Sequence, residues 1–247
     1  MTAEIDTTMV LAAGLGKRMR PLTDTMPKPM VPLAGRPLID HTLDRLADSG
    51  IRRAVVNVHY KAEVLEAHIA ERQAKGLSPL ISVSDERGLL LETGGGVVKA
   101  LPLLGDRPFL ICNSDTTWIE TSVRNLDRVI AGWDAAAIDS LMLLAKRDRS
   151  LGYSGDGDFH IDAKGRLTRR SAGETSPYVF TGVSIATPGM FNDVPQGRFS
   201  LNVVWDRAIA SGRLFGMVLD GWWMHVGTPP ALLDAERFIA ELKAPSE

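Results

Sequence analysis

Strand-like and helix-like segments alternate through residues 7–115, and this alternation constrains the fold more than any other feature of the sequence. Apolar runs typical of buried strands alternate with helical segments such as 36–50, where Ile39, Leu43 and Leu46 share one face and Gly50 supplies a stop. The expected strands are 7–13, 52–60, 79–86 and 107–115, and the expected helices are 36–50, 61–72 and 94–104. Because each helix returns the chain to the same end of the sheet, the pattern predicts an α/β fold around a mostly parallel sheet.

The second half of the chain is less regular. It contains expected strands at 140–146, 178–188 and 214–228, and a hairpin over 157–170 that turns at Ala163–Gly165. Helices are expected at 202–212 and 229–244. We find no internal repeat, low-complexity tract or clear linker, so we expect one domain with an α/β core and a small antiparallel lobe.

The charge balance excludes a general affinity for nucleic acid or for anionic membranes, because 28 Lys and Arg residues face 30 Asp and Glu residues. No apolar run is long enough to span a membrane, and the first residues are acidic where a signal peptide is basic, so we expect a cytoplasmic protein. The single cysteine, Cys112, excludes an internal disulfide and lies in an apolar run, which predicts a core position.

The segment Leu11–Leu22 combines bare backbone with positive charge. Gly14 and Gly16 allow backbone N–H groups to approach an anion closely, and Lys17 and Arg18 supply charge, so the segment is suited to phosphate. It is neither a P-loop nor a dinucleotide fingerprint, because Leu11, Arg18 and Met19 stand where those motifs need other residues. Taken alone, a plain strand-to-helix turn with solvated basic residues remains an equal alternative.

A second basic residue lies in a stiff segment. Pro27 and Pro29 flank Lys28, fix φ and remove N–H groups, which predicts a lysine held on an extended stretch. The alternative from these residues alone is a proline-rich turn whose lysine points to water.

Together these motifs resemble the signature of the sugar-1-phosphate nucleotidyltransferases: LAAGLGKRMRPLT (11–23) is followed by PKPMVPLAGRPLI (27–39), ETGGG (92–96), NSD (113–115), FTGVSI (180–185) and WWMHVGTP (222–229). The chain is most similar to the N-acetylmuramate-1-phosphate uridylyltransferases of bacterial cell-wall recycling, with mannose-1-phosphate guanylyltransferases and other hexose or heptose relatives as alternatives. The resemblance implies a Rossmann-like fold in one domain, residues 1–247, with a nucleotide-binding half over about 1–120 and a sugar-binding half over about 121–247. Many larger relatives add a C-terminal β-helix domain; only one helix is expected after Gly227, so we expect no such domain in this sequence.

The resemblance also implies a reaction and its residues. A sugar 1-phosphate would attack the α-phosphorus of a nucleoside triphosphate and release pyrophosphate, which demands positioning and charge neutralisation rather than a protein nucleophile. The implied catalytic residues are Arg18, Lys28 and Asp115. The implied nucleotide-binding residues are Leu11, Ala12, Ala13, Gly14, Gly16, Lys17, Arg18, Glu92, Thr93 and Gly94. The implied sugar-binding residues are Asn113, Glu174, Thr181 and Gly182.

One position departs from the family pattern. The family usually has Asp in W-x-D-x-G-T, and this chain has His225 there, so the implied metal ligands are Asp115 and His225. Mg²⁺ is the expected cofactor, and Mn²⁺ is an alternative because an imidazole suits softer divalent ions better. Three outcomes stay open: His225 binds the metal, Asp115 holds it with water and phosphates, or turnover is lost and the protein senses nucleotide sugars. The sequence does not indicate an oligomeric state.

Overall fold

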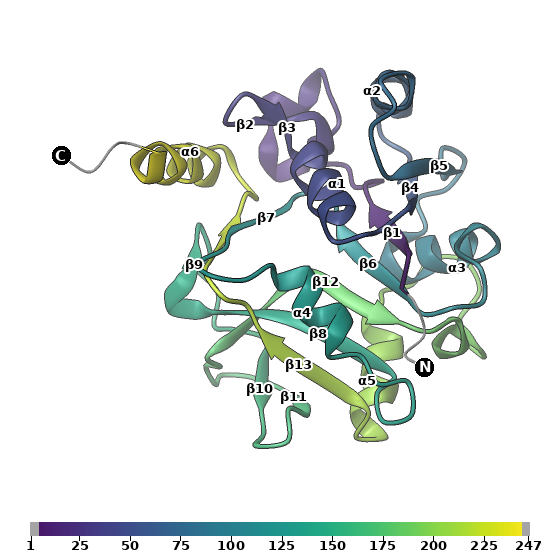
Figure 1. Ribbon diagram of the computed structural model, residues 1–247, viewed down its shortest axis with the longest axis vertical. Coiled ribbons are helices and arrows are strands. Elements are labelled where there is room, and N and C mark those ends of the chain that lie inside the picture. Colours follow the sequence, from purple (N-terminus) through teal and green to yellow (C-terminus); the bar gives the residue numbers. More distant parts are fainter. Residues whose placement is uncertain (1–4, 244–247) are drawn as a thin grey trace.

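The computed structural model describes residues 5–243 and has a mixed, mostly parallel sheet at its centre (Figure 1). The main strands run in the spatial order β13-β8-β12-β6-β1-β4-β5. Their bounds are β13 Leu214–Val218, β8 Ser140–Lys146, β12 Tyr178–Ala186, β6 Phe109–Asn113, β1 Thr7–Leu11, β4 Arg53–Val58 and β5 Leu80–Asp85. β6, β1, β4 and β5 are parallel neighbours, which confirms the fold predicted from the alternation.

Helices cover both faces of this sheet. Successive strand residues point to opposite sides, so each strand contributes apolar side chains to both faces. Val10 and Val56 belong to the core on one face, whereas their neighbours Met9 and Val55 belong to the core on the other. The first face packs against α1 (Leu38–Asp48), α2 (Ala62–Ala74) and α4 (Asn125–Ala131), and the second against α3 (Glu92–Leu104) and α5 (Asn202–Ala210). Figure 1 shows α1 and α4 in front of the strands.

A single antiparallel strand joins the two halves of the sheet. β12 pairs antiparallel with both β6 and β8, and its register shifts between Phe180 and Val183. The predicted hairpin is present as β10 (Phe159–Ile161) and β11 (Leu167–Arg169), which extend from the start of β12. These strands are the small antiparallel lobe expected from the sequence.

The expected strand over 214–228 is wrong as one element. Gly221, at φ 122°, lies between β13 and a second strand, β14 (Trp222–His225). β14 leaves the main sheet and joins a separate three-stranded sheet with β7 (Thr116–Ile119) and β9 (Ser150–Leu151). This break carries His225 back toward the end of β6, because β14 pairs with β7, which follows β6 directly.

Other local elements also differ from the expectation. β7 and the seven-residue α4 have no counterpart in it. α3 begins at Glu92 rather than at the glycines from position 94. Short elements also surround the expected phosphate segment: the 3-10 turns η1 (Lys17–Met19), η2 (Leu22–Asp24) and η3 (Lys28–Met30), and the strands β2 (Pro32–Leu33) and β3 (Arg36–Pro37). Two further 3-10 turns are η4 (Arg147–Arg149) and η5 (Pro188–Phe191).

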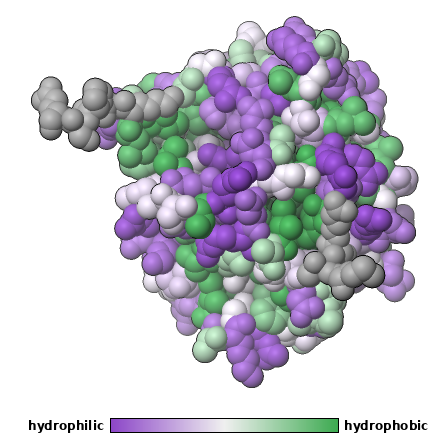
Figure 2. Space-filling view, in the orientation of Figure 1, coloured by the Kyte–Doolittle hydropathy of each residue, from purple (hydrophilic) through white to green (hydrophobic). Residues whose placement is uncertain are grey.

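The last helix, α6 (Pro229–Lys243), packs on a third core cluster that includes Met19, Val31 and Met224. This cluster connects the segment around Lys28 to β14. Figure 2 shows hydrophilic residues over much of the face drawn in Figure 1, with an apolar patch at α6, where Leu233 and Leu242 are exposed. No helix within residues 5–243 is long and apolar enough to cross a membrane.

Candidate active site

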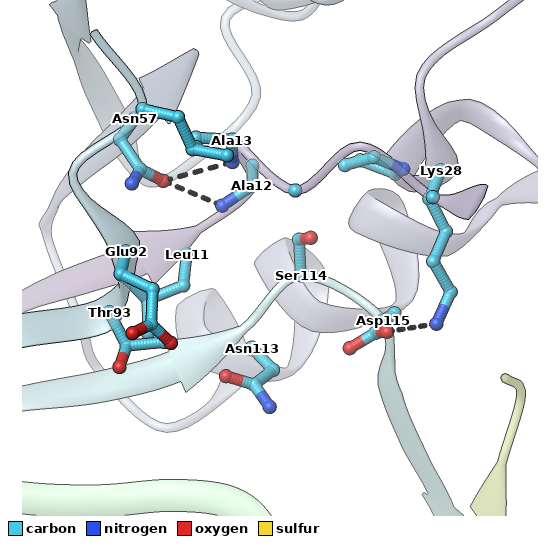
Figure 3. A pocket seen from close by; sticks show the side chains of 14 residues that line it. Leu11, Ala12, Ala13, Lys28, Asn57, Glu92, Thr93, Asn113, Ser114 and Asp115 are labelled. Carbon is cyan, nitrogen blue, oxygen red and sulfur yellow. Dashed lines mark hydrogen bonds and ion pairs between the residues drawn. The ribbon is translucent and has the colours of Figure 1, made fainter. Parts of the chain in front are cut away.

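A cleft of about 300 Å³ opens at the carboxyl ends of β1, β4 and β6, the edge where open parallel sheets bind ligands (Figure 3). Its walls are the segment after β1, the start of η3, the segment after β6 and the start of α3. It is lined by Leu11, Ala12, Ala13, Gly14, Gly16, Lys28, Pro29, Asn57, Leu90, Glu92, Thr93, Asn113, Ser114 and Asp115. Most of the residues assigned to the nucleotide by resemblance are therefore together; Gly94 is not among the lining residues, and its N–H donates to the Phe199 carbonyl oxygen at 2.8 Å.

Lys28 and Asp115 form an ion pair at one end of this cleft, opposite Glu92 and Thr93 (Figure 3). The two side chains are only 14% and 29% exposed, so water screens the pair less than a surface pair. The predicted extended conformation of Lys28 is wrong: Pro27 is extended, but Lys28 begins the 3-10 turn η3. The turn aims the lysine at Asp115, and the prediction failed because proline restricts the conformation of its neighbour without fixing it.

The basic residues after β1 line a separate small cavity beside Lys28. Lys17 and Arg18 belong to η1 and line a cavity of about 230 Å³ together with Gly16 and Lys28. Gly16 has φ 60°, and a Cβ there would lie 2.9 Å from the Thr23 side chain and 3.2 Å from Lys28. A glycine is therefore needed where the chain turns, which brings three cations to one place.

A cavity of about 240 Å³, called the second cavity below, adjoins the first cleft, the one of about 300 Å³. Its lining includes Arg18, Tyr153, Asp158, Thr181 and His225, and it shares Asn113 and Asp115 with the first cleft. The two cavities therefore meet at the end of β6. Two ligands bound in these cavities would approach each other at Asn113 and Asp115.

The residues assigned to the sugar differ in their placement. Thr181 lines the second cavity, although its hydroxyl donates to the Leu143 carbonyl oxygen at 2.8 Å. Gly182, at φ 92°, lies behind Asn113, where a Cβ would approach the Asn113 amide nitrogen to 2.7 Å. Glu174 is not among the residues lining either cavity, and its carboxylate accepts from the Ser171 N–H at 3.2 Å. Its role in sugar binding stays a prediction.

His225 lies in the second cavity among aromatic rings. Its ring centroid is 5.3 Å from that of Trp223 and 6.1 Å from that of Tyr153. Burial and then the positive charge of Lys28 lower the pKa of His225 below its usual value, and Asp115 opposes them. The imidazole is therefore held neutral, which is the form that can bind a metal.

The donor set at this point fits a divalent metal with two protein ligands. Within residues 5–243 no group of three or more His, Cys, Asp or Glu side chains is placed to hold a metal ion. Asp115 and His225 nevertheless line the same cavity, and Mg²⁺ sites in phosphate-transferring enzymes often use one or two protein ligands with phosphates and water.

Sequence reasoning missed several residues of the two cavities. Asn57 and Ser114 line the first, and Tyr153 and Asp158 the second. Asn57 carried a detectable signal, because it is a polar residue near the end of an otherwise apolar strand. Asp158 lies in the expected hairpin over 157–170, and Tyr153 lies in an irregular segment without a sequence signal.

Cys112 has the structural role predicted for it. The thiol is buried, and burial raises its pKa to about 12.

Trp223 is also buried, whereas Trp222 packs against Phe238 at 5.3 Å between ring centroids.

Comparison with known proteins assigns the chain to a family. Residues 7–242 match the family described as nucleotidyl transferase. The chain belongs to this family. It is 49% identical to N-acetylmuramate alpha-1-phosphate uridylyltransferase of Caulobacter vibrioides, over 94% of this chain and 96% of the relative. It is 34% identical to the protein of the same name from Neisseria meningitidis serogroup B, over 92% and 96%.

The fold comparison agrees. The structure of UDP-glucose pyrophosphorylase complexed with UDP-glucose superposes with a TM-score of 0.79 over 97% of this chain and 100% of that chain, at 15% identity. The resemblance drawn from the sequence motifs is thus confirmed, and the chain is a sugar-1-phosphate nucleotidyltransferase. Enzymes of this family generally use a divalent metal.

Proposed function

We propose that this protein transfers a uridylyl group from UTP to N-acetylmuramate 1-phosphate, forming a nucleotide sugar for cell-wall recycling in the cytoplasm. The support for these substrates is the 49% identity to the Caulobacter uridylyltransferase along almost the whole of both chains. The support for the reaction geometry is the pair of cavities that share Asn113 and Asp115.

In this proposal the half over about 1–120 binds the nucleotide and the half over about 121–247 binds the sugar. The base lies toward Glu92 and Thr93, and the phosphates lie toward Lys28 and Arg18. The sugar occupies the second cavity, beside Thr181. A 1-phosphate oxygen then attacks the α-phosphorus, the bond between the α- and β-phosphates breaks, and pyrophosphate leaves.

The chain's own residues orient the two substrates and neutralise charge. Lys28 lines the first cleft and pairs with Asp115, which both cavities share, so in this proposal it offsets the negative charge that develops on the transferred phosphoryl group. Arg18 lies between the second cavity and the cavity beside Lys17, where it holds the leaving phosphates. Asp115 and His225 would hold Mg²⁺ or Mn²⁺, which when bound supplies further positive charge to the phosphate oxygens.

The test is pyrophosphate release by the purified protein with UTP, GTP, CTP, ATP or dTTP, each combined with several sugar 1-phosphates, in Mg²⁺ and in Mn²⁺. An Asp115→Asn variant purified in the same way controls for contaminating enzymes. Release confined to UTP and N-acetylmuramate 1-phosphate is the expected result. Another productive pair, such as GTP with mannose 1-phosphate, would replace the substrates and keep the mechanism. Silence in every pair despite saturable nucleotide-sugar binding would favour the sensing alternative.

A further inference from the structure

A buried hydrogen-bonded chain runs beneath the nucleotide cleft and connects two of its walls. The Asn57 side-chain oxygen accepts from the Ala12 N–H at 2.6 Å and from the Ala13 N–H at 3.3 Å (Figure 3). The Asn57 side-chain nitrogen donates to Glu86 Oε1 at 2.7 Å. Glu86 Oε2 accepts from the Leu91 N–H at 3.1 Å.

Both side chains of this connection are shielded from solvent. Asn57 is 2% exposed and Glu86 is fully buried. Gly96 of α3 closes the space, because a Cβ there would lie 2.8 Å from Glu86 Oε1 and 2.9 Å from the Asn57 amide nitrogen. A buried polar group is costly unless it is paired, and here the pairing fixes which end of the amide faces the Ala12–Ala13 backbone.

The connection also limits how the cleft can meet a nucleotide. The N–H groups of Ala12 and Ala13 are used by Asn57, so phosphate contacts from this loop fall to the backbone from Gly14 to Gly16. Leu91 adjoins Leu90 and Glu92, which line the opposite wall. One carboxylate therefore sets the spacing between the wall after β1 and the wall at the start of α3.

We propose that Asn57 and Glu86 are positioning residues for the nucleotide, acting through the Ala12–Ala13 backbone and through Leu91. This inference rests on the proposed placement of the nucleotide in the first cleft. Neither side chain takes part in the chemistry. Their contribution is to hold the two walls at the separation that the bound nucleotide requires before it arrives, so that binding does not need to order them.

The pair allows a swap experiment. In Asn57→Asp alone, two carboxylates face each other in a buried space. In Glu86→Gln alone, one amide oxygen replaces the two carboxylate oxygens that accept from the Asn57 amide and from the Leu91 N–H, so one of these donors loses its acceptor. In the double variant, the carboxylate introduced at position 57 would accept from the backbone and from the amide group introduced at position 86. The oxygen of that amide would accept from the Leu91 N–H, so every bond has a partner at unchanged net charge.

The measurements are the Kd of UTP by calorimetry, KM for each substrate, kcat and Tm. We expect each single variant to weaken UTP binding about tenfold or more, with KM for the sugar 1-phosphate changed much less, and the double variant to recover most of the UTP affinity. Asn57→Ala supplies a third variant if Asn57→Asp does not fold. Asn125→Ala is the matched control, because Asn125 is also a fully buried asparagine, hydrogen-bonded to the Asp220 backbone outside the two cavities.

The control separates positioning from stability. Asn125→Ala is expected to lower Tm without changing UTP affinity. If the Asn57 and Glu86 variants lower Tm as the control does and leave the Kd and KM of UTP unchanged, the proposal is wrong. If the double variant recovers Tm and not UTP affinity, it is also wrong. Failure of the unsubstituted protein to bind UTP or any other nucleotide would instead overturn the proposed function.

Discussion

Replacing Lys28 with Met should separate charge from shape at the centre of the site. Methionine keeps an unbranched apolar stem and removes the ammonium group, so η3 and the two prolines beside position 28 stay in place. Because the Lys28 and Asp115 side chains are only 14% and 29% exposed, the lysine acts where water screens it weakly. Removing one such charge from a developing anion typically lowers kcat about a hundredfold or more, equivalent to roughly 2.7 kcal/mol of transition-state stabilisation.

The assay is pyrophosphate release at saturating substrates, with Tm measured on the same samples. The variant also leaves the Asp115 carboxylate without its cation, which costs about 1–3 kcal/mol of stability, so the rate is measured well below Tm. Lys164→Met, in the turn between β10 and β11, is the control and should keep normal kcat. Near-normal kcat in Lys28→Met, or an equal loss in the control, would refute the role assigned to the lysine.

Three further results are expected. His225→Asp should shift the relative activity in Mg²⁺ and Mn²⁺ toward Mg²⁺, and an unchanged metal profile would count against ligation by His225. Cys112, with its pKa raised to about 12, is neutral at pH 8 and should resist a thiol reagent until the protein is unfolded in urea; rapid labelling of folded protein would contradict this burial. Gly182→Ala should raise KM for the sugar 1-phosphate about tenfold, because its Cβ displaces Asn113. An unchanged sugar KM would remove Asn113 from the sugar site.

The parallel half of the fold was predictable because its signals are local. The strands at 7–11, 53–58, 80–85 and 109–113 are short segments rich in apolar residues, and α1 places Ile39, Leu43 and Leu46 on one buried face. The position of the first cleft follows from this half, since polar residues at the ends of parallel strands must meet at one edge.

The remaining elements depend on contacts between distant residues. β7 is stabilised by pairing with β14, which brings Thr116 opposite His225. A window of neighbouring residues holds no information about that pairing, and α4 is too short for a clear periodicity. The sequence does not indicate a role for Glu86 for the same reason, because that role depends on its contacts with Asn57 and Leu91.

The direction of β12 explains how the two cavities come to share residues. β12 runs antiparallel to β6, with Val183 opposite Cys112, so the stretch at Thr181 and Gly182 lies beside the carboxyl end of β6. If β12 ran parallel to β6, the last residues of β12 rather than its first half would lie at that edge. Because β12 is antiparallel, Thr181 and Gly182 in its first half lie beside the end of β6. The β10–β11 hairpin pairs with the first residue of β12, Tyr178. Substitutions near the start of β12 are therefore expected to change sugar selection, and substitutions at the start of α3 are expected to change nucleotide selection.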